Sequence, residues 1–163
     1  MAWYVRRFEP LFLLAIEAEG EAITCVRFGE PPSGAALAPP GHELLEAAVR
    51  QFEEYFARQR RRFDLPLSPR GTEFQVRVWN ALLEIPYGET RSYGELALKL
   101  GLGGAARAVG AANGANPIAI VVPCHRVIGA GGRLCGYGGG LDRKKFLLDL
   151  ESGASTSLIS ASA

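Results

Sequence analysis

The sequence predicts an α+β protein, and three observations lead to this prediction. The stretch FLLAIEAEGEAITCVRF indicates two strands joined by a turn, because apolar and polar residues roughly alternate in the second strand and glycine suits the turn. Apolar residues recur at spacings of three and four within residues 42–62, which indicates an amphipathic helix. Two capping boxes in the second half indicate further helices. We expect an N-terminal α/β domain with a small antiparallel sheet and a helix in residues 1–67, a second domain rich in helices in residues 68–151, and a disordered tail in residues 152–163.

Composition and charge exclude several classes of protein. Of the 163 residues, 48% are hydrophobic, which is enough for a buried core. A formal net charge of +1 does not by itself indicate a nucleic-acid partner. The 3 Cys have no paired spacing, so we expect a reducing compartment and no disulfide framework. There is no secretory signal pattern and no apolar run of about 18 residues. We therefore expect no membrane segment and a cytoplasmic protein, associated with the nucleoid if the source is bacterial or archaeal.

Local patterns set the expected elements of the first domain. The two strands lie in residues 12–28, and the helix over residues 42–62 would bury Leu45, Val49, Phe52 and Phe56. The basic cluster Arg58–Arg62 ends this helix, and a solvated helix end is favoured over a nucleic-acid contact. Residues 65–69 have the composition of a linker.

The second half contains a helix-turn-helix candidate. Capping boxes at Thr72 with Gln75 and at Ser92 with Glu95 open two helices, the second over residues 93–100. The segment AARAVGAANGAN, rich in small residues, predicts another helix after a glycine-containing turn. Because this helix carries no Leu or Ile, we favour close contact with a flat or grooved partner over close packing against another helix.

The C-terminal part combines a buried strand with loops and a last helix. The β-branched run Ile118–Val122 predicts a short buried strand that ends at Pro123. Residues 127–134 predict a hairpin, residues 136–140 predict a glycine loop, and residues 141–150 predict the final helix.

Cys124 directly follows the predicted strand, and three interpretations of it are open. A lone Cys is most often a small buried apolar residue. A zinc ligand would need partners, but the chain has only 2 His, 3 Cys and no CxxC motif, so we expect no metal. A nucleophile would need a base, which the adjacent His125 could provide.

Several longer motifs together carry a family resemblance. They are PYGETRSYGELA, AARAVGAANGANP, PCHRVIG and GYGGGLDRKKFLLDLE, and they cover about residues 71–151 without a gap. This stretch resembles the O6-alkylguanine-DNA alkyltransferases, also called methylated-DNA–protein-cysteine methyltransferases. The resemblance implies that the second domain is winged helix-turn-helix-like.

The resemblance also implies a function in direct DNA repair. An alkyl group would pass from O6-alkylguanine, and from O4-alkylthymine, to Cys124 once and irreversibly, after the damaged nucleotide has flipped out of the duplex. Double-stranded DNA would be bound in the minor groove. We expect no cofactor, no metal, and a monomer that could bind DNA cooperatively.

Five residues would carry the chemistry, as the resemblance implies. Cys124 would accept the alkyl group, and His125 would take its proton through a bridging water. Glu151 would hold His125 and balance its charge. Asn116 would stabilise the turn that presents the thiol, and Tyr93 would donate a proton or hydrogen bond to N3 of the leaving guanine.

Further residues would contact DNA and the flipped base. Arg107 would fill the gap left by the flipped nucleotide, and Tyr93 would crowd the adjacent phosphate. The small-residue helix would lie in the minor groove, where it would contact DNA through Ala105, Ala106 and Gly110. The pocket would be formed by Val127, Gly138, Ala119 and Tyr137, with the carbonyls of Cys124 and Val127 accepting from the guanine amino group. Some relatives have Ser where this chain has Gly138 and Pro where it has Ala119, which leaves the tolerance for bulky alkyl groups open.

Two other functions fit parts of the pattern. A cysteine hydrolase acting on a small ester or amide would use the same Cys-His-Glu set. A DNA-binding module that marks lesions for other proteins would use the helix-turn-helix alone. Cys135, on the glycine loop, is interpreted as a small filler and not as a second reactive thiol.

Overall fold

The computed structural model describes residues 1–8 and 12–154, and its contacts divide the chain into two units. The first unit comprises residues 1–72 together with residues 117–121, and the second comprises residues 73–116 together with the chain from residue 122 onward. The division at 72/73 lies five residues beyond the predicted boundary. The segment 117–121 was expected in the second domain, but hydrogen bonds to a strand of the first unit place it there.

The first unit contains a three-stranded antiparallel sheet in the order β1-β2-β3. Its strands are β1 (Ala2–Phe8), β2 (Phe12–Glu19) and β3 (Ala22–Phe28). The predicted pair of strands joined near Gly20 is confirmed as β2 and β3. β1 was not predicted, because its sequence AWYVRRF does not alternate cleanly between apolar and polar residues.

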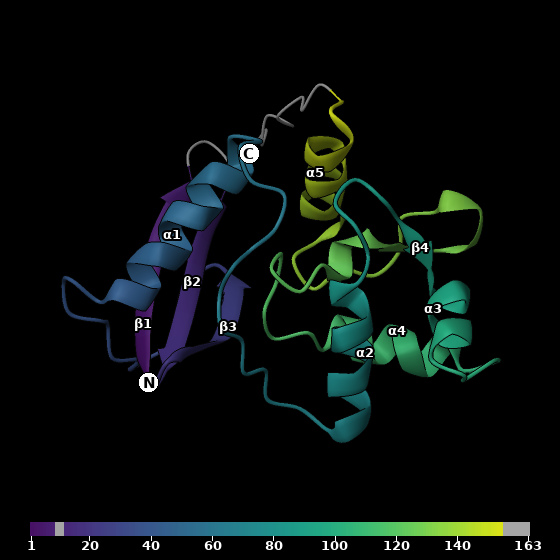
Figure 1. Ribbon diagram of the computed structural model, residues 1–163, viewed down its shortest axis with the longest axis horizontal. Helices are drawn as coiled ribbons and strands as arrows, with labels where there is room; N and C mark the ends of the chain where they lie inside the picture. Colours follow the sequence, from purple (N-terminus) through teal and green to yellow (C-terminus); the bar gives the residue numbers. More distant parts are fainter. Residues whose placement is uncertain (9–11, 155–163) are drawn as a thin grey trace. The chain divides into compact units, whose positions relative to one another are not determined.

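Helix α1 (Glu43–Phe56) lies along the sheet, as Figure 1 shows. It ends at Phe56, so its predicted extension to residue 62 is wrong. Ala57 is the only apolar residue between Phe56 and Phe63. The ring of Phe63 returns to that of Phe52 at a centroid distance of 4.9 Å. The chain reverses through Arg58, which has a left-handed φ of 59°. The basic cluster Arg58–Arg62 therefore follows the helix instead of capping it.

The run Ile118–Val122 is almost completely buried, but it is not the predicted strand. It meets the sheet of its unit at the bridge between Val26 and Ile118, held by the bonds Val26 N–H to Pro117 O (2.9 Å) and Ala119 N–H to Val26 O (3.0 Å). Ile120 has a φ of +71°, a strained conformation for a β-branched residue, and it turns the chain out of any ladder. Pro123 consequently ends an irregular buried segment, not a strand.

The second unit is built from helices around a very small sheet. The helices are α2 (Glu73–Leu83), α3 (Tyr93–Lys99), α4 (Ala106–Gly114) and α5 (Leu141–Ser152), with β4 (Arg91–Ser92) pairing in parallel with β5 (Val127–Ile128). The capping box predicted at Ser92 and Glu95 is confirmed. Glu95 N–H donates to Ser92 Oγ at 3.1 Å, and Ser92 N–H donates to the Glu95 carboxylate at 2.6 Å. Helices α3 and α4 pack together as the predicted helix-turn-helix pair.

Two predictions for the C-terminal part are corrected. Residues 127–134 do not form a hairpin, because β5 pairs with β4 and the chain after it closes a short turn with Gly129 N–H bonded to Arg133 O at 2.7 Å. Ser152 belongs to α5 and not to the predicted tail; residues 155–163 of that tail lie outside the described residues. Within the described ranges, no helix is long and apolar enough to cross a membrane.

Candidate active site

Cys124 is the first residue of a short 3-10 helix, η1 (Cys124–Arg126), and is only 6% exposed. Asn116, in the loop after α4, holds it from one side. The Asn116 side-chain amide donates to Val122 O at 2.8 Å and to Cys124 Sγ at 3.1 Å. Burial raises the pKa of the Cys124 thiol, and the Asn116 hydrogen bond opposes that rise because it favours the thiolate. Asn116 therefore contacts the backbone of the turn beside the thiol, as expected from the sequence, and it also contacts the sulfur itself, which was not expected.

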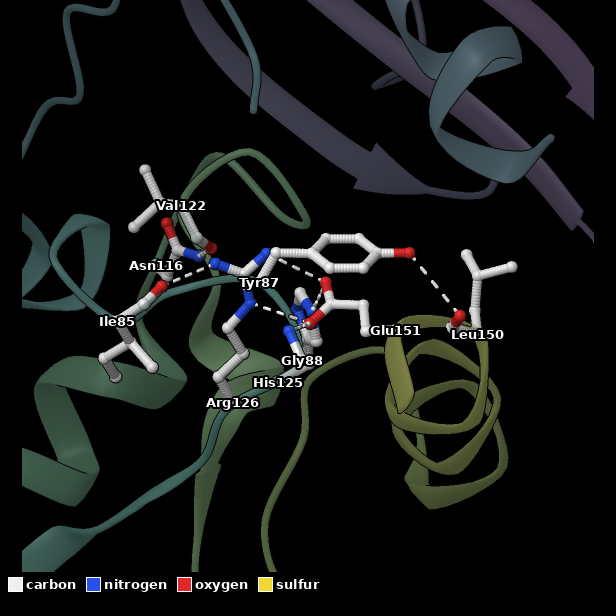
Figure 2. A network of polar contacts seen from close by, with 9 residues as sticks. All are labelled: Ile85, Tyr87, Gly88, Asn116, Val122, His125, Arg126, Leu150 and Glu151. Atoms are coloured by element: carbon white, nitrogen blue, oxygen red, sulfur yellow. Dashed lines mark hydrogen bonds and ion pairs between the residues drawn. The ribbon is translucent and has the colours of Figure 1, made fainter. Parts of the chain in front are cut away.

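His125 and Glu151 form a buried pair, drawn in Figure 2. His125 Nε2 lies 2.8 Å from Glu151 Oε1, and both side chains are almost fully buried. Burial by itself would raise the pKa of Glu151, but hydrogen bonds from His125 and Arg126 bring it well below its usual range, so Glu151 is ionised. An ionised carboxylate only accepts, so Nε2 carries the hydrogen and Nδ1 is the basic nitrogen of the neutral ring. Burial lowers the pKa of His125, which keeps that ring neutral.

Arg126 completes this network and was not identified from the sequence. Its Nε donates to Glu151 Oε2 at 2.8 Å and its Nη2 to Oε1 at 2.9 Å, while Nη1 donates to Ile85 O at 2.7 Å. Gly88 N–H also donates to Oε2, at 3.3 Å. A buried arginine needs a partner, so Arg126 inside an apolar run was a usable signal, but the sequence could not say which acid it meets.

Lys144 is a second buried cation that the sequence did not indicate. It lies in the first turn of α5, is 0% exposed, and donates to Val127 O at 2.5 Å, Cys135 O at 3.0 Å and Gly136 O at 3.3 Å. Three carbonyls thus match the three hydrogens of one ammonium group. Burial lowers the pKa of Lys144. The contacts tie α5 to β5 and to the loop that follows.

Tyr93, the first residue of α3, points toward the same loop. Its hydroxyl donates to Cys135 O at 3.2 Å, and burial raises its pKa, so it stays protonated. A Cβ added at Gly110 on α4 would lie 3.6 Å from the Tyr93 ring, so glycine allows the ring and the helix to approach closely.

Helix α4 is packed on one side and open on the other. Val109, Ala112 and Asn113 are buried, and Trp79 Nε1 donates to Ala112 O at 2.8 Å. Arg107 is exposed, and its helix neighbours are small residues, with Ala105 and Ala106 partly buried. The expected small-residue surface with one long basic side chain is therefore present, although α4 also packs closely against α2 and α3.

The predicted pocket residues lie in different places. Val127 is fully buried in β5, and its carbonyl already accepts from Lys144. The Cys124 carbonyl accepts from Asn113 Nδ2 at 3.3 Å. A carbonyl oxygen accepts about two hydrogen bonds, and Cys124 O already accepts a second one from Val127 N–H, so the contact of these carbonyls with the guanine amino group stays a prediction.

Three further residues complete the predicted set. Gly138 is exposed in the glycine loop, close to Gly114 O, which a Cβ at Gly138 would meet at 3.9 Å. Burial raises the pKa of Tyr137 well above its usual value, and the charge of Cys124 adds to the rise. Ala119 belongs to the segment 117–121 of the first unit, so its role in the pocket stays a prediction.

The other two cysteines, Cys25 and Cys135, are partly buried. All three cysteines are free thiols. Burial, with the nearby Glu17 carboxylate, raises the pKa of Cys25 to about 11, so this thiol is unreactive at neutral pH. Among residues 1–8 and 12–154, no group of three or more His, Cys, Asp or Glu is placed to hold a metal ion.

The fold and this geometry define a class of protein in which a buried thiol lies beside a histidine–carboxylate pair, in the same unit as a helix-turn-helix. Comparisons with known proteins narrow the class. Residues 73–153 match the family model of the 6-O-methylguanine DNA methyltransferase DNA-binding domain. A methylated-DNA–protein-cysteine methyltransferase of Mycobacterium tuberculosis is 56% identical over 146 residues, 87% of each chain. One of Methanosarcina acetivorans is 63% identical over 109 residues, 67% of this chain and 70% of the relative.

Solved structures agree. The crystal structure of Mycobacterium tuberculosis OGT in complex with DNA matches with a TM-score of 0.87 and 48% identity, covering 96% of this chain and 97% of that one. An O6-methylguanine DNA methyltransferase from Methanococcus jannaschii matches with a TM-score of 0.70 and 26% identity, covering 98% and 99%. The chain belongs to the O6-methylguanine-DNA methyltransferase family, and its enzyme class is that of the methylated-DNA–protein-cysteine methyltransferases.

Proposed function

We propose that the protein repairs DNA by moving the alkyl group of O6-alkylguanine to Cys124 in a single, irreversible step. The contact that carries this proposal is the hydrogen bond from Asn116 to the Cys124 sulfur, beside the His125–Glu151 pair. This set prepares one thiolate, and the DNA complex of the similar Mycobacterium tuberculosis protein supports DNA as the partner.

The proposed transfer joins a proton movement to the displacement of guanine from the alkyl carbon. The Cys124 proton passes through a water molecule to Nδ1 of His125, a buried nitrogen with no hydrogen-bond partner among the described residues. The sulfur forms a bond to the alkyl carbon, and the bond between that carbon and O6 breaks with its electrons passing to O6. Tyr93, which stays protonated, donates a hydrogen bond or proton to N3 of the leaving guanine. The thioether product does not hydrolyse, so each chain reacts once.

Access to the alkyl group requires the base to leave the duplex. We propose that α4 lies in the minor groove, because Ala105, Ala106 and Gly110 permit close approach, and that Arg107 occupies the space of the flipped nucleotide. Pocket contacts from Val127, Gly138, Ala119 and Tyr137 belong to the same proposal. We also propose that the protein reacts with O4-alkylthymine and acts as a monomer.

The deciding experiment is intact mass and peptide mapping after incubation with excess duplex DNA containing O6-methylguanine. The expected result is a gain of about 14 Da on Cys124 that saturates at one per chain. Cys25 and Cys135 serve as internal controls and stay unmodified, and Cys124→Ser gains nothing. Tight binding without a mass change would favour the lesion-marking module. Neither binding nor a mass change, with repeated turnover of an activated ester, would favour the hydrolase.

A further inference from the structure

Glu151 is shared between two basic side chains, those of His125 and Arg126. Its Oε1 accepts from His125 Nε2 and from Arg126 Nη2, and its Oε2 accepts from Arg126 Nε and from Gly88 N–H. These four donors fill the roughly four acceptor positions of a carboxylate. Figure 2 shows Arg126 and His125 both directed at this one group.

The charges of the network nearly cancel before His125 takes up a proton. The Arg126 guanidinium is always charged, so Arg126 and the ionised Glu151 already form a neutral pair in contact with the imidazole. An unshared carboxylate would strongly favour an imidazolium, as the charge of Glu151 does here, but the positive charges of Arg126 and Lys144 oppose it. His125 is 0% exposed, so solvent cannot stabilise the additional positive charge.

We infer that Arg126 is a positioning residue which, by holding and neutralising Glu151, keeps His125 neutral with its hydrogen on Nε2 and its Nδ1 ready to accept the Cys124 proton. This inference rests on the proposed function, since only a transfer that begins from a thiol needs such a base. It also explains why a guanidinium directly follows the histidine in η1: one short turn presents both side chains to the same carboxylate.

A purely structural role for Arg126 would predict a different result on mutation. The bond from Arg126 Nη1 to Ile85 O would then tie η1 to the end of α2, and loss of the guanidinium would lower stability alone. In our inference, loss of the charge also makes the His125–Glu151 pair take up a proton at higher pH, because the carboxylate is no longer compensated. A lysine at position 126 keeps the positive charge but cannot make the bidentate contact of arginine with Glu151. Such a variant should therefore separate the effect of charge on His125 from the effect of geometry.

The test is titration of His125 by 15N NMR, which reports both the charge and the tautomer of the imidazole. The chain has 2 His, so His42→Gln assigns the signals. In the unaltered protein we expect a neutral ring with hydrogen on Nε2 at pH 7; an imidazolium there overturns the inference, whatever the variants do. In Arg126→Gln we expect uptake of the proton at higher pH, and an unchanged titration in the folded variant also overturns it.

Two variants complete the experiment. Arg126→Lys keeps the charge, so we expect His125 to stay neutral while methyl transfer slows about 10- to 100-fold through lost positioning; an imidazolium in this variant at pH 7 contradicts the charge effect. Arg91→Gln removes an exposed guanidinium that pairs with Glu89 at 2.7 Å, and it should leave the titration unchanged. None of the NMR measurements uses DNA, so failure of the proposed repair activity and failure of this inference are seen separately.

Discussion

Removal of the Asn116 side-chain amide should make Cys124 less acidic and slower to react. In Asn116→Ala the thiolate loses its hydrogen bond of 3.1 Å, and Val122 O loses one of 2.8 Å. Val122 O keeps a bond from the backbone N–H of Cys124 at 2.8 Å, so the turn does not lose its only donor. The expected result is a folded protein with a higher pKa at Cys124.

The size of the effect follows from the bonds removed. A hydrogen bond to a charged group contributes about 1.5–3 kcal/mol, and a factor of ten corresponds to about 1.4 kcal/mol. The thiolate population at a fixed neutral pH should therefore fall roughly 10- to 150-fold, and the reaction rate with it. Loss of two hydrogen bonds should cost about 1–3 kcal/mol in the free energy of unfolding.

The assay is the rate of Cys124 carboxamidomethylation by iodoacetamide between pH 5 and pH 10, followed by peptide mapping. The same variants are then tested for methyl transfer from DNA. Asn80→Ala is the matched control, because Asn80 is an exposed asparagine on α2 of the same unit. The reasoning is refuted if the pH profile of Asn116→Ala coincides with that of the unaltered protein while its folding is intact.

Three further predictions concern DNA, the turn behind Glu151, and pH. Arg107→Ala should slow repair of duplex DNA far more than reaction with free O6-benzylguanine, because only the duplex requires flipping; equal losses would count against the proposed role of Arg107. Gly88→Ala should lower stability by about 1–3 kcal/mol and weaken methyl transfer, since Gly88 has a φ of +79° and an added Cβ would lie 3.2 Å from Glu151 O; a wild-type melting temperature would contradict this. Stability in denaturant should fall as the pH drops below about 6.5, because unfolded His125 takes up a proton that the buried, neutral His125 refuses. Ionised Glu151 adds to the loss at lower pH, since its pKa in the folded protein is depressed. Equal unfolding free energies at pH 7.5 and pH 5 would show that the burial of neutral His125 has no such cost.

The helices were largely predictable because their signals are local. Apolar spacing located α1, and the residues at Thr72 and Ser92 predicted the starts of α2 and α3. The last helix was predicted over residues 141–150, within α5. Cys124 beside His125 was visible as a candidate nucleophile and base for the same reason, since adjacency needs no tertiary structure. The motif that carries the family resemblance lies in one continuous stretch.

Non-local pairing set the limit of what the sequence could predict. The run Ile118–Val122 has the composition of a strand, but Ile120 adopts a left-handed conformation and the run meets the sheet at the bridge between Val26 and Ile118. Likewise Val127–Ile128 was assigned to a hairpin with its own neighbours, whereas its partner is Arg91–Ser92, far away in the chain. A strand is defined by the backbone that it bonds to, and a β-branched sequence does not specify that partner.

The charged partners of the site were decided by the tertiary structure in the same way. A Cys-His pair, a small-residue helix and an acid at the end of the last helix could all be recognised in the sequence. Only the fold brought Arg126 and His125 onto one carboxylate of Glu151, and Lys144 onto three carbonyls. The physical reason is that a buried charge is tolerated only with partners at hydrogen-bonding distance, and those partners come from α5, η1 and loops that are separated in the sequence.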